Sequence, residues 1–459
     1  MVQTFTYRTR IEAPAGEVFA WHARTGAFER LNPPWDPVEV VHRTGGIRDG
    51  DRVTIRMHLG PLPVHWTLEH RDYVGGRRFR DVQVSGPFRS WEHTHEVHPA
   101  AGDAAILEDT IRYELPLGAA GRAVGQSMAQ RRLVHLFAHR HAVTRHDVEM
   151  HARHAKGETM RILISGATGL VGSSLVPLLT TGGHEVLRLR RSSSSAGPSA
   201  VAWDPRVGLT DPSSVGSFDA VVHLAGESIA SGRWTAARKE LIRASRVEGT
   251  RRLCESMAEL PRPPATLVCA SAIGYYGNRG EEELDESADP GPGFLANVCR
   301  AWEAATEPAV KAGIRVVHVR FGVVLSPRGG ALAKMLTPFR LGAGGVMGSG
   351  RQYMSWVGID DAVRAIQHCL ITANLSGPVN VVSPSPVTNA EFTRTLGRVL
   401  RRPTILPMPA FAARLAFGEM ADELLLASTR AIPQRLIETG FRFQDVALED
   451  CLRRLLGAA

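Results

Sequence analysis

The sequence predicts an α/β protein built around a doubly wound parallel sheet, preceded by an α+β domain and followed by a small helical C-terminal domain. Three observations indicate this fold class. The chain of 459 residues is longer than one hydrophobic core usually serves, so two or three domains are expected. The first third alternates polar and apolar residues as antiparallel strands do, and then turns helical. From Met160 onward, short apolar runs alternate with helical patterns, which is typical of a parallel sheet with helical crossovers.

The N-terminal pattern begins with a strand that contains Phe5, Tyr7 and Ile11, and a short helix opens at residues 18–21. Segments of alternating polarity follow between Gly, Pro and Asp turns, at residues 38–41, 52–58, 65–71, 78–84, 91–98 and 105–115. Residues 125–150 then show helical spacing of their apolar side chains. A curved antiparallel sheet wrapped on one long helix satisfies this order, so residues 1–154 are expected to form one domain.

Local motifs agree with that arrangement. The stretch Ile11-Glu12-Ala13-Pro14, the following Glu17-Val18-Phe19, and the segment from Gly86-Pro87-Phe88 to Trp91-Glu92-His93 resemble the SRPBCC, or helix-grip, superfamily. The resemblance covers most of residues 1–154 and implies a helix-grip domain. Because members often hold an apolar ligand between sheet and helix, two alternatives stand: an apolar ligand, or a core filled by side chains.

The helix that closes this domain is rich in histidine. His135 and His139 have the i, i+4 spacing of metal-ligand pairs, but no acidic residue follows His135 as in an H-E-x-x-H motif. We therefore expect a solvated basic helix and no metal site. The polar residues 155–159 are expected to form a linker.

A glycine-rich turn follows the linker. The apolar run Arg161–Ser165 predicts a buried strand and leads into Gly166-Ala167-Thr168-Gly169-Leu170-Val171-Gly172, after which residues 173–181 are helical and residues 184–190 form a second strand. Glycines at this spacing allow a tight turn, close approach of the backbone to a pyrophosphate, and close packing of helix on strand. Between a strand and a helix, the motif predicts a dinucleotide site that includes Thr168 and Leu170.

The type of dinucleotide is indicated at the end of the second strand. An acidic residue there favours NAD, whereas arginine accommodates a 2′-phosphate. The chain has Arg190, Arg191 and Ser192 at this place and no acid. A guanidinium matches phosphate in charge and geometry, so the sequence favours NADP(H).

Further apolar strands are predicted at residues 218–226, 266–271 and 315–320, the first ending in Leu224, Ala225 and Gly226. With the glycine spacing, this turn and the stretches Arg320-Phe321-Gly322 and Val357–Val363 resemble the extended short-chain dehydrogenase/reductases, whose Rossmann fold is the doubly wound sheet predicted above. The resemblance implies that Arg320 and the turn at Leu224–Gly226 lie at the cofactor.

The finer resemblance is to an atypical branch labelled "epimerase family protein". It rests on Gly226–Ala230 with Gly232-Arg233-Trp234, Ser271–Gly277, Cys299–Glu303, Gly329–Leu336 and Gly348–Gln352. The Rossmann domain is expected over residues 160–405. Residues 406–459, which include Gly418-Glu419-Met420, look like that branch's short C-terminal domain of unknown function.

Short-chain dehydrogenases use a Ser and a Tyr-x-x-x-Lys pair, in which the lysine lowers the tyrosine pKa. Ser271 matches the serine, but counting back from Glu303 places Leu295 and Cys299 where the tyrosine and lysine belong. This departure argues against ordinary alcohol–ketone chemistry. Tyr275 and Tyr276 are either substitute phenols or aromatic lining, and Cys299 is either a redox thiol or a buried packing residue. The polar residues Glu227, Arg233 and Lys334 are either substrate contacts or surface charges.

The remaining features exclude several classes. The formal charge of +8 is spread among interspersed acids, so nucleic-acid binding is not expected. Five scattered cysteines without a CxxC pair, and no apolar run near the roughly 20 residues that span a bilayer, favour a cytoplasmic protein without a membrane span. The sequence therefore predicts an NADP(H)-binding oxidoreductase or epimerase-like enzyme for an unknown small-molecule substrate. The alternative is a non-catalytic nucleotide-binding regulatory or scaffold protein.

Overall fold

The computed structural model describes residues 1–60, 62–154, 159–191, 199–210 and 216–458. The described chain forms two compact units, one built mainly from residues 1–154 and the other mainly from residues 159–458. Of the predicted linker at residues 155–159, residues 155–158 lie outside the described residues.

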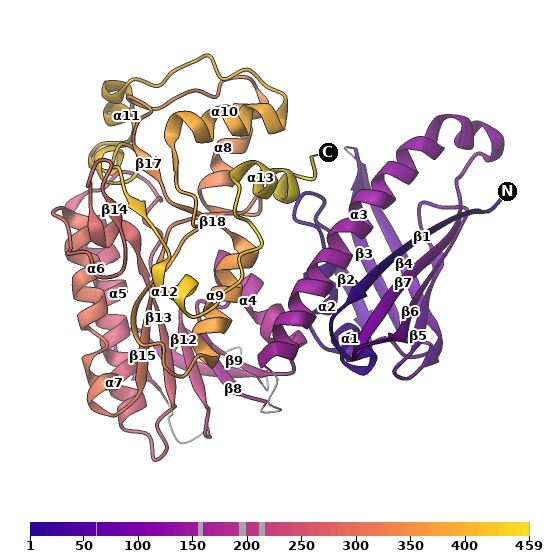
Figure 1. Ribbon diagram of the computed structural model, residues 1–459, viewed down its shortest axis with the longest axis horizontal. Coiled ribbons are helices and arrows are strands. Elements are labelled where there is room, and N and C mark those ends of the chain that lie inside the picture. The colour runs from indigo at the N-terminus through magenta and orange to yellow at the C-terminus, as the bar shows by residue number, and fades with distance from the viewer. Residues whose placement is uncertain (61, 155–158, 192–198, 211–215, 459) are drawn as a thin grey trace. The chain divides into compact units, whose positions relative to one another are not determined.

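The first unit is a seven-stranded antiparallel sheet in the order β1-β7-β6-β5-β4-β3-β2, with the 37-residue helix α3 lying along one face (Figure 1). The predicted α+β helix-grip arrangement is therefore confirmed. Its elements are β1 (Gln3–Ile11), α1 (Ala15–Ala23), α2 (Ala27–Leu31), β2 (Glu39–Thr44), β3 (Arg52–Leu59), β4 (Leu62–Val74), β5 (Arg78–Ser85), β6 (Ser90–Ala100), β7 (Ala104–Glu114) and α3 (Gly118–His154).

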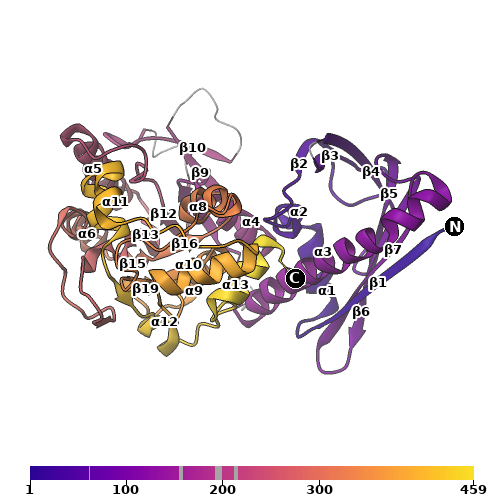
Figure 2. The ribbon, with the colours of Figure 1, turned by 90° about the horizontal axis from the view of Figure 1, so that it is seen from above.

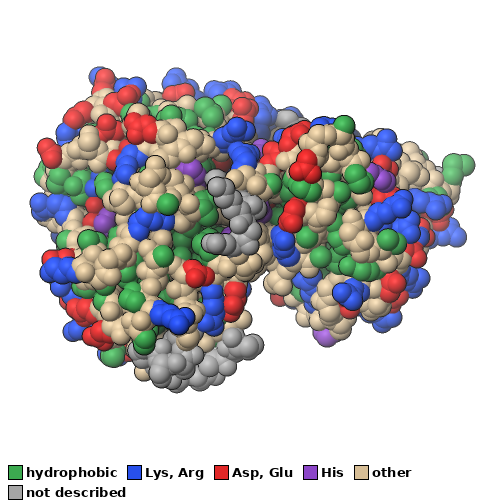
Figure 3. All heavy atoms as spheres, turned by 60° about the horizontal axis from the view of Figure 1, so that its bottom comes forward, with side chains coloured by type: hydrophobic (Ala, Val, Ile, Leu, Met, Phe, Trp, Pro, Cys, Tyr) green, Lys and Arg blue, Asp and Glu red, His purple; other side chains and the backbone are tan. Residues whose placement is uncertain are grey.

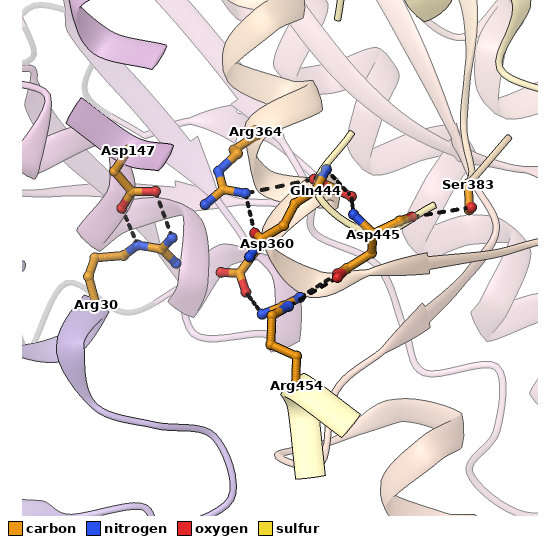
Figure 4. Close-up of polar contacts among 9 residues, drawn as sticks. Arg30, Asp147, Asp360, Arg364, Ser383, Gln444, Asp445 and Arg454 are labelled. Carbon is orange, nitrogen blue, oxygen red and sulfur yellow. Dashed lines mark hydrogen bonds and ion pairs between the residues drawn. The ribbon is translucent and has the colours of Figure 1, made fainter. Parts of the chain in front are cut away.

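Alternating burial along the strands builds the core of this unit. On β6, Trp91, His93, His95 and Val97 are buried while the residues between them are not. The helix α2 was not predicted, because five residues are too few to show helical periodicity. It is held by a buried ion pair in which Arg30 Nε and Nη2 donate to the two carboxylate oxygens of Asp147 on α3, at 2.7 and 2.9 Å (Figure 4).

The second unit contains an eight-stranded sheet in the order β11-β10-β9-β8-β12-β13-β15-β19. All neighbours run parallel except β10 and β11. The central strands are β8 (Arg161–Ser165), β9 (Glu185–Arg190), β10 (Ala200–Asp204), β12 (Ala220–His223), β13 (Thr266–Ala272), β15 (Arg315–Phe321) and β19 (Gly377–Val381), and β11 covers Gly208–Leu209. This is the predicted Rossmann order, in which the chain reverses its direction of sheet growth between β8 and β12.

Helices cover both faces of this sheet. Figures 1 and 2 show α5 (Ala236–Ala258), α6 (Phe294–Ala304) and α7 (Glu307–Lys311) on one face, and α4 (Leu170–Thr181) and α9 (Ile359–Ile371) on the other. On the α5 side, a buried core that includes Leu163, Val221, Leu253, Leu267 and Trp302 joins the strands to the helices. The short apolar runs of the sequence are thus strands buried on both faces.

The segment after residue 405 lies within the second unit. It contains α11 (Ala410–Phe417), the π-helix Ala421–Leu425, β21 (Arg430–Ala431), α12 (Gln434–Glu438) and α13 (Leu448–Leu456). The strand β21 pairs in parallel with β14 (Glu283–Leu284), and α13 contacts α10 (Asn389–Leu400). The unit is completed by β16 (Val323–Leu325), α8 (Gly330–Arg340), β17 (Tyr353–Met354), β18 (Trp356–Gly358) and β20 (Val387–Thr388).

The face of the molecule in Figure 3 shows basic and acidic side chains interspersed. Among the described helices, none combines the length and the apolar character that crossing a bilayer requires.

Candidate functional site

The turn between β8 and α4 depends on its glycines. Gly166 has φ of +68°, and a Cβ on it would lie 2.8 Å from the backbone carbonyl carbon of Leu224. A Cβ on Gly172 would lie 2.2 Å from the backbone oxygen of Gly166, and one on Gly169 would lie 3.3 Å from the same oxygen. A side chain at Gly166 would therefore push apart the ends of β8 and β12. A side chain at Gly172 would push α4 away from the turn that precedes it. Because α4 begins at Leu170, its N-terminal N–H groups are oriented to receive an anion such as a pyrophosphate.

A series of hydrogen-bonded polar side chains lies between the ends of β8 and β12, where the direction of sheet growth reverses. The Ser165 hydroxyl accepts hydrogen bonds from the N–H groups of Leu224 and Ala225, at 3.1 and 3.2 Å. It also lies 2.7 Å from His223 Nδ1, whose other ring nitrogen lies 3.0 Å from the Thr250 hydroxyl on α5. Burial lowers the pKa of His223 to about 4, so the ring is neutral at pH 7. This series of hydrogen bonds fixes the Leu224–Gly226 turn against Gly166.

At the end of β9, the side chains of Arg190 and Arg191 are exposed. Because β9 is the direct neighbour of β8, both arginines lie beside the glycine turn. Two exposed guanidinium groups at this place are available to an anionic ligand. Ser192, the third residue of the predicted set, lies outside the described residues.

Ser271 and Arg320 face each other from adjacent strands and meet a helical carboxylate. They are register partners on β13 and β15. The Ser271 hydroxyl donates to Glu303 Oε1 at 2.7 Å, and Arg320 donates from Nε and Nη2 to the two oxygens of Glu303 at 2.8 Å each. Burial lowers the pKa of Arg320, but hydrogen bonds and charge from Glu303 outweigh this effect and raise it above its ordinary value. Arg320 thus holds the Glu303 carboxylate beside the Ser271 hydroxyl, and its place at the cofactor stays a prediction.

The two candidate tyrosines have different environments. Tyr276 is fully buried, its hydroxyl donates to Asn380 Oδ1 at 2.8 Å, and it receives a hydrogen bond from Arg320 Nη1 at 3.0 Å. Burial raises the pKa of Tyr276 to about 12, although the Arg320 charge opposes the shift. Tyr275 is partly exposed, and the Arg320 guanidinium carbon lies 3.5 Å from the centre of its ring. Tyr275 is therefore the more exposed of the two tyrosines.

Leu295 and Cys299 on α6 fill the place where the Tyr-x-x-x-Lys pair is expected. Both are buried, at 7% and 4% exposure. A Cβ on Gly274 would lie 3.3 Å from Leu295 Cβ and 3.9 Å from Cys299 Sγ, so the turn Ile273–Tyr276 packs directly on these two side chains. Burial raises the pKa of Cys299 to about 12, which leaves a protonated packing residue and no reactive thiolate at neutral pH.

The segment after residue 405 anchors α6. The Glu423 carboxylate accepts hydrogen bonds from the N–H groups of Phe294 and Leu295 at 3.2 and 3.1 Å. A negative charge at a helix N-terminus is stabilising because it meets the positive end of the helix dipole. Trp234, Ile242, Leu295 and Met420 form a small apolar core beside it.

The three polar residues left open by the sequence have protein partners. Lys334 Nζ donates to the carbonyl of Ala230 at 2.8 Å, and Arg233 Nη1 donates to the carbonyl of Leu415 at 3.1 Å. Glu227 pairs with Arg238 at 3.0 Å. These contacts join the loop after β12 to helices α5, α8 and α11.

Glu303, Asn380 and Glu423 were not predicted as site residues. For Glu303 a signal was present, because Leu295, Cys299 and Glu303 are spaced at i, i+4 and i+8 and share one face of α6. Asn380 and Glu423 are separated from their partners by 104 and 129 residues, and no local pattern connects them.

Comparison with known proteins places this geometry in a family. Residues 162–382 match the model of the NAD dependent epimerase/dehydratase family, residues 408–455 match a domain of unknown function, and residues 11–137 match the polyketide cyclase / dehydrase and lipid transport family. An epimerase family protein of Mycobacterium bovis is 47% identical over 291 residues, which are 63% of this chain and 96% of that protein.

Two solved structures are similar to this chain. A nucleoside-diphosphate sugar epimerase from Corynebacterium glutamicum is 33% identical, covers 99% of this chain and 90% of its own, and superposes with a TM-score of 0.79. Human epimerase family protein SDR39U1, solved with NADPH, is 36% identical over 65% of this chain and 99% of its own, with a TM-score of 0.60. The chain therefore belongs to the NAD dependent epimerase/dehydratase family, in its epimerase family protein branch, and carries a helix-grip domain at its N-terminal side.

Proposed function

We propose that this protein is an NADP(H)-dependent oxidoreductase or epimerase-like enzyme that acts on a small molecule through Ser271 and Tyr275. The observation that carries the proposal is the group formed by Ser271, Glu303 and Arg320 with the Tyr275 ring. It lies at the carboxyl edge of the sheet, where β8 and β12 also end. Ligands of open α/β sheets bind at this edge.

The residues at the reversal point suit a dinucleotide. Gly166, Gly169 and Gly172 leave room for a pyrophosphate at the N-terminus of α4, with Thr168 and Leu170 in the same turn, and Leu224–Gly226 flank it. The exposed Arg190 and Arg191 supply positive charge for a 2′-phosphate. The NADPH in the human relative supports the same choice of cofactor. When bound, the nicotinamide would donate or accept a hydride.

Ser271 and Glu303 provide a path for the accompanying proton. Because the Ser271 hydroxyl donates its proton to Glu303, its oxygen keeps lone pairs that accept a hydrogen bond from a substrate hydroxyl. In the oxidative direction the substrate oxygen loses its proton to the Ser271 oxygen, while the serine proton passes to the Glu303 carboxylate. In the reverse direction the protons return. Tyr275 donates a hydrogen bond to the same substrate oxygen, and Arg320 acts as a positioning residue.

One observation favours a second candidate function. Leu295 and Cys299 are buried packing residues where other family members are expected to carry a tyrosine and a lysine. A protein that binds the nucleotide without turnover, as a regulatory or scaffold protein, would need neither of them.

Calorimetric titration of the full chain with NADPH and NADH tests the cofactor, and the proposal expects tighter binding of NADPH. Absorbance of the nicotinamide during incubation with a substrate panel then separates the two functions. Nucleoside-diphosphate sugars come first in the panel, because the Corynebacterium glutamicum relative is named for them. Tight NADPH binding without turnover, together with no small molecule that copurifies with the protein, would favour the regulatory alternative.

A further inference from the structure

The sheet of the first unit carries buried histidines and aspartates on the face covered by α3. Asp81 on β5 is the register partner of His93 on β6, and Asp109 on β7 is the register partner of His95. Because residues two apart on a strand point to the same side, His93 and His95 face the same space. His141 of α3 closes this space from the opposite side, with Nε2 2.6 Å from Asp109 Oδ2.

Three of these side chains direct one donor atom each toward a common point. Asp81 Oδ2 lies 3.3 Å from His95 Nε2, within hydrogen-bonding distance, and 3.7 Å from His93 Nδ1. Each of the three residues offers one ligand atom within 4.8 Å of the others. Tetrahedral coordination with bonds of about 2.0 Å separates ligand atoms by about 3.3 Å. The two distances from Asp81 Oδ2 to the histidine nitrogens are close to this separation.

The remaining polar atoms of Asp81, His93 and His95 contact neighbouring side chains. Asp109 Oδ1 lies 3.0 Å from His93 Nε2 and 2.6 Å from His95 Nδ1. His70 Nδ1 lies 2.6 Å from Asp81 Oδ1. In metal sites, the ring nitrogen that does not bind the ion is usually held by a carboxylate, which fixes the orientation of the ring. Asp109 has this relation to both histidines.

The surroundings are aromatic and buried. The Phe79 ring stacks on His95 with centroids 4.2 Å apart, and Phe137 meets His93 edge-on at 5.1 Å. The side chains of His93, His95 and Asp81 are 3%, 8% and 14% exposed. Burying several ionisable groups in such a core is costly unless each is paired or coordinates a metal.

We propose that Asp81, His93 and His95 bind a divalent transition-metal ion, Zn²⁺ by the chemistry of the donors, and that Asp109, His70 and His141 orient the ligands. Two imidazoles and one carboxylate suit Zn²⁺ and its first-row neighbours rather than Mg²⁺ or Ca²⁺, which prefer oxygen. This site is separate from the proposed nucleotide site and does not depend on it. The His135 and His139 pair that the sequence brings to attention is not part of it, because His139 packs on Trp35.

The experiment uses the full chain. The protein, stripped of metal with a chelator, is titrated with Zn²⁺ by calorimetry and separately with Co²⁺, whose visible spectrum reports coordination geometry. We expect one equivalent to bind, the Co²⁺ spectrum to show tetrahedral nitrogen and oxygen ligands, and Zn²⁺ to displace it. Zn²⁺ should also raise the melting temperature of the stripped protein, because a ligand that binds only the folded state stabilises it.

Variants locate the ion. Asp81→Asn, which preserves side-chain shape, and His93→Gln should each weaken Zn²⁺ binding more than about 10-fold, and Asp109→Asn should weaken it on the order of 10- to 100-fold. The matched control replaces the exposed His42 and His65 with alanine and should bind as the wild type does. If the ligand variants fail to fold, the wild-type Co²⁺ spectrum still decides. No saturable binding at one equivalent, an octahedral Co²⁺ spectrum, or loss of binding in the exposed-histidine control would overturn the proposal.

Discussion

The guanidinium carbon of Arg320 lies 3.5 Å from the centre of the Tyr275 ring, while the same guanidinium holds Glu303 through two parallel hydrogen bonds. One planar cation thus positions both the partly exposed Tyr275 ring and the carboxylate that accepts a hydrogen bond from the Ser271 hydroxyl. Lysine cannot replace it, because an ammonium group cannot donate two parallel hydrogen bonds to one carboxylate and has no planar surface to stack on the Tyr275 ring.

Arg320→Lys should therefore lower the free energy of unfolding by about 1–3 kcal/mol, the value of lost hydrogen bonds between charged groups. It should also lower kcat more than it raises KM, because Tyr275 and Glu303 lose their common support. Thermal unfolding and steady-state kinetics measure the two effects. Arg300→Lys on the exposed face of α6 is the control and should change neither.

Arg191→Ala should weaken NADPH binding on the order of 10- to 100-fold and leave NADH binding unchanged, because a charged contact to the 2′-phosphate contributes about 1–3 kcal/mol. Calorimetry with both cofactors measures the difference. Arg188→Ala, which removes an exposed arginine on β9 three residues before Arg191, is the matched control. Equal weakening of NADPH and NADH by Arg191→Ala would contradict a phosphate contact.

Ser271→Ala and Tyr275→Phe should each reduce kcat by about 10²- to 10⁴-fold, the usual contribution of a positioned acid or base. Cys299→Ala should retain turnover, because its thiol is buried and protonated. The assignment fails if Cys299→Ala abolishes turnover on a substrate that the two hydroxyl variants still convert. Tyr276→Phe separates support from catalysis: it should lower stability through the lost hydrogen bond to Asn380 more than it lowers kcat.

Arg454→Ala should destabilise the second unit by about 3–5 kcal/mol, the usual cost of leaving a buried charge without its partner. Arg454 on α13 lies 2.6 Å from Asp360 and also pairs with Asp445, and Figure 4 shows it between these two carboxylates. Arg453→Ala is the control, since Arg453 pairs with Glu449 on the outside of the same helix. Similar unfolding midpoints for the two variants would contradict a stabilising role of the buried cluster.

His223→Gln should reduce the loss of stability in acid. The pKa of His223 is lowered by burial from 6.5 to about 4, so its contribution to stability is complete above pH 6.5 and is lost as the pH falls toward 4. The loss amounts to about 3 kcal/mol, since each pKa unit corresponds to about 1.4 kcal/mol. The free energy of unfolding is measured for both proteins between pH 4 and about 7.5, and the two curves should converge as the pH falls. A constant offset would show that His223 does not titrate.

The sequence predicted features whose determinants are local. Gly166, Gly169 and Gly172 stand between one strand and one helix, and their packing roles follow from that order. The alternation along β6 likewise predicted which side chains would share a face. Both patterns lie within short segments of the sequence, so they can be recognised without knowing the fold.

Features that depend on register or on long-range pairing were not predicted. Asp81 joins His93 and His95 only through the pairing of β5 with β6, and a slip of one residue would turn Asp81 to the other face. Tyr275 and Tyr276 were equivalent candidates in the sequence, but in the fold Tyr276 is buried and its hydroxyl bonds to Asn380, 104 residues away. The burial of a side chain decides whether its phenol or thiol can take part in a reaction, and that burial depends on residues that are distant in the sequence.

The Glu423 carboxylate at the start of α6 has a consequence for biosynthesis. Residues 293–304 leave the ribosome well before residue 423, and Asp360 is synthesised 94 residues ahead of Arg454. During translation, helix α6, which carries Glu303, is therefore made long before Glu423, the carboxylate at its N-terminus. Asp360 and Asp445 are likewise made before Arg454, with which they pair. The hydrogen bonds from Phe294 and Leu295 to Glu423, and the pairing of Arg454 with Asp360 and Asp445, can therefore form only after residues 423–454 have emerged.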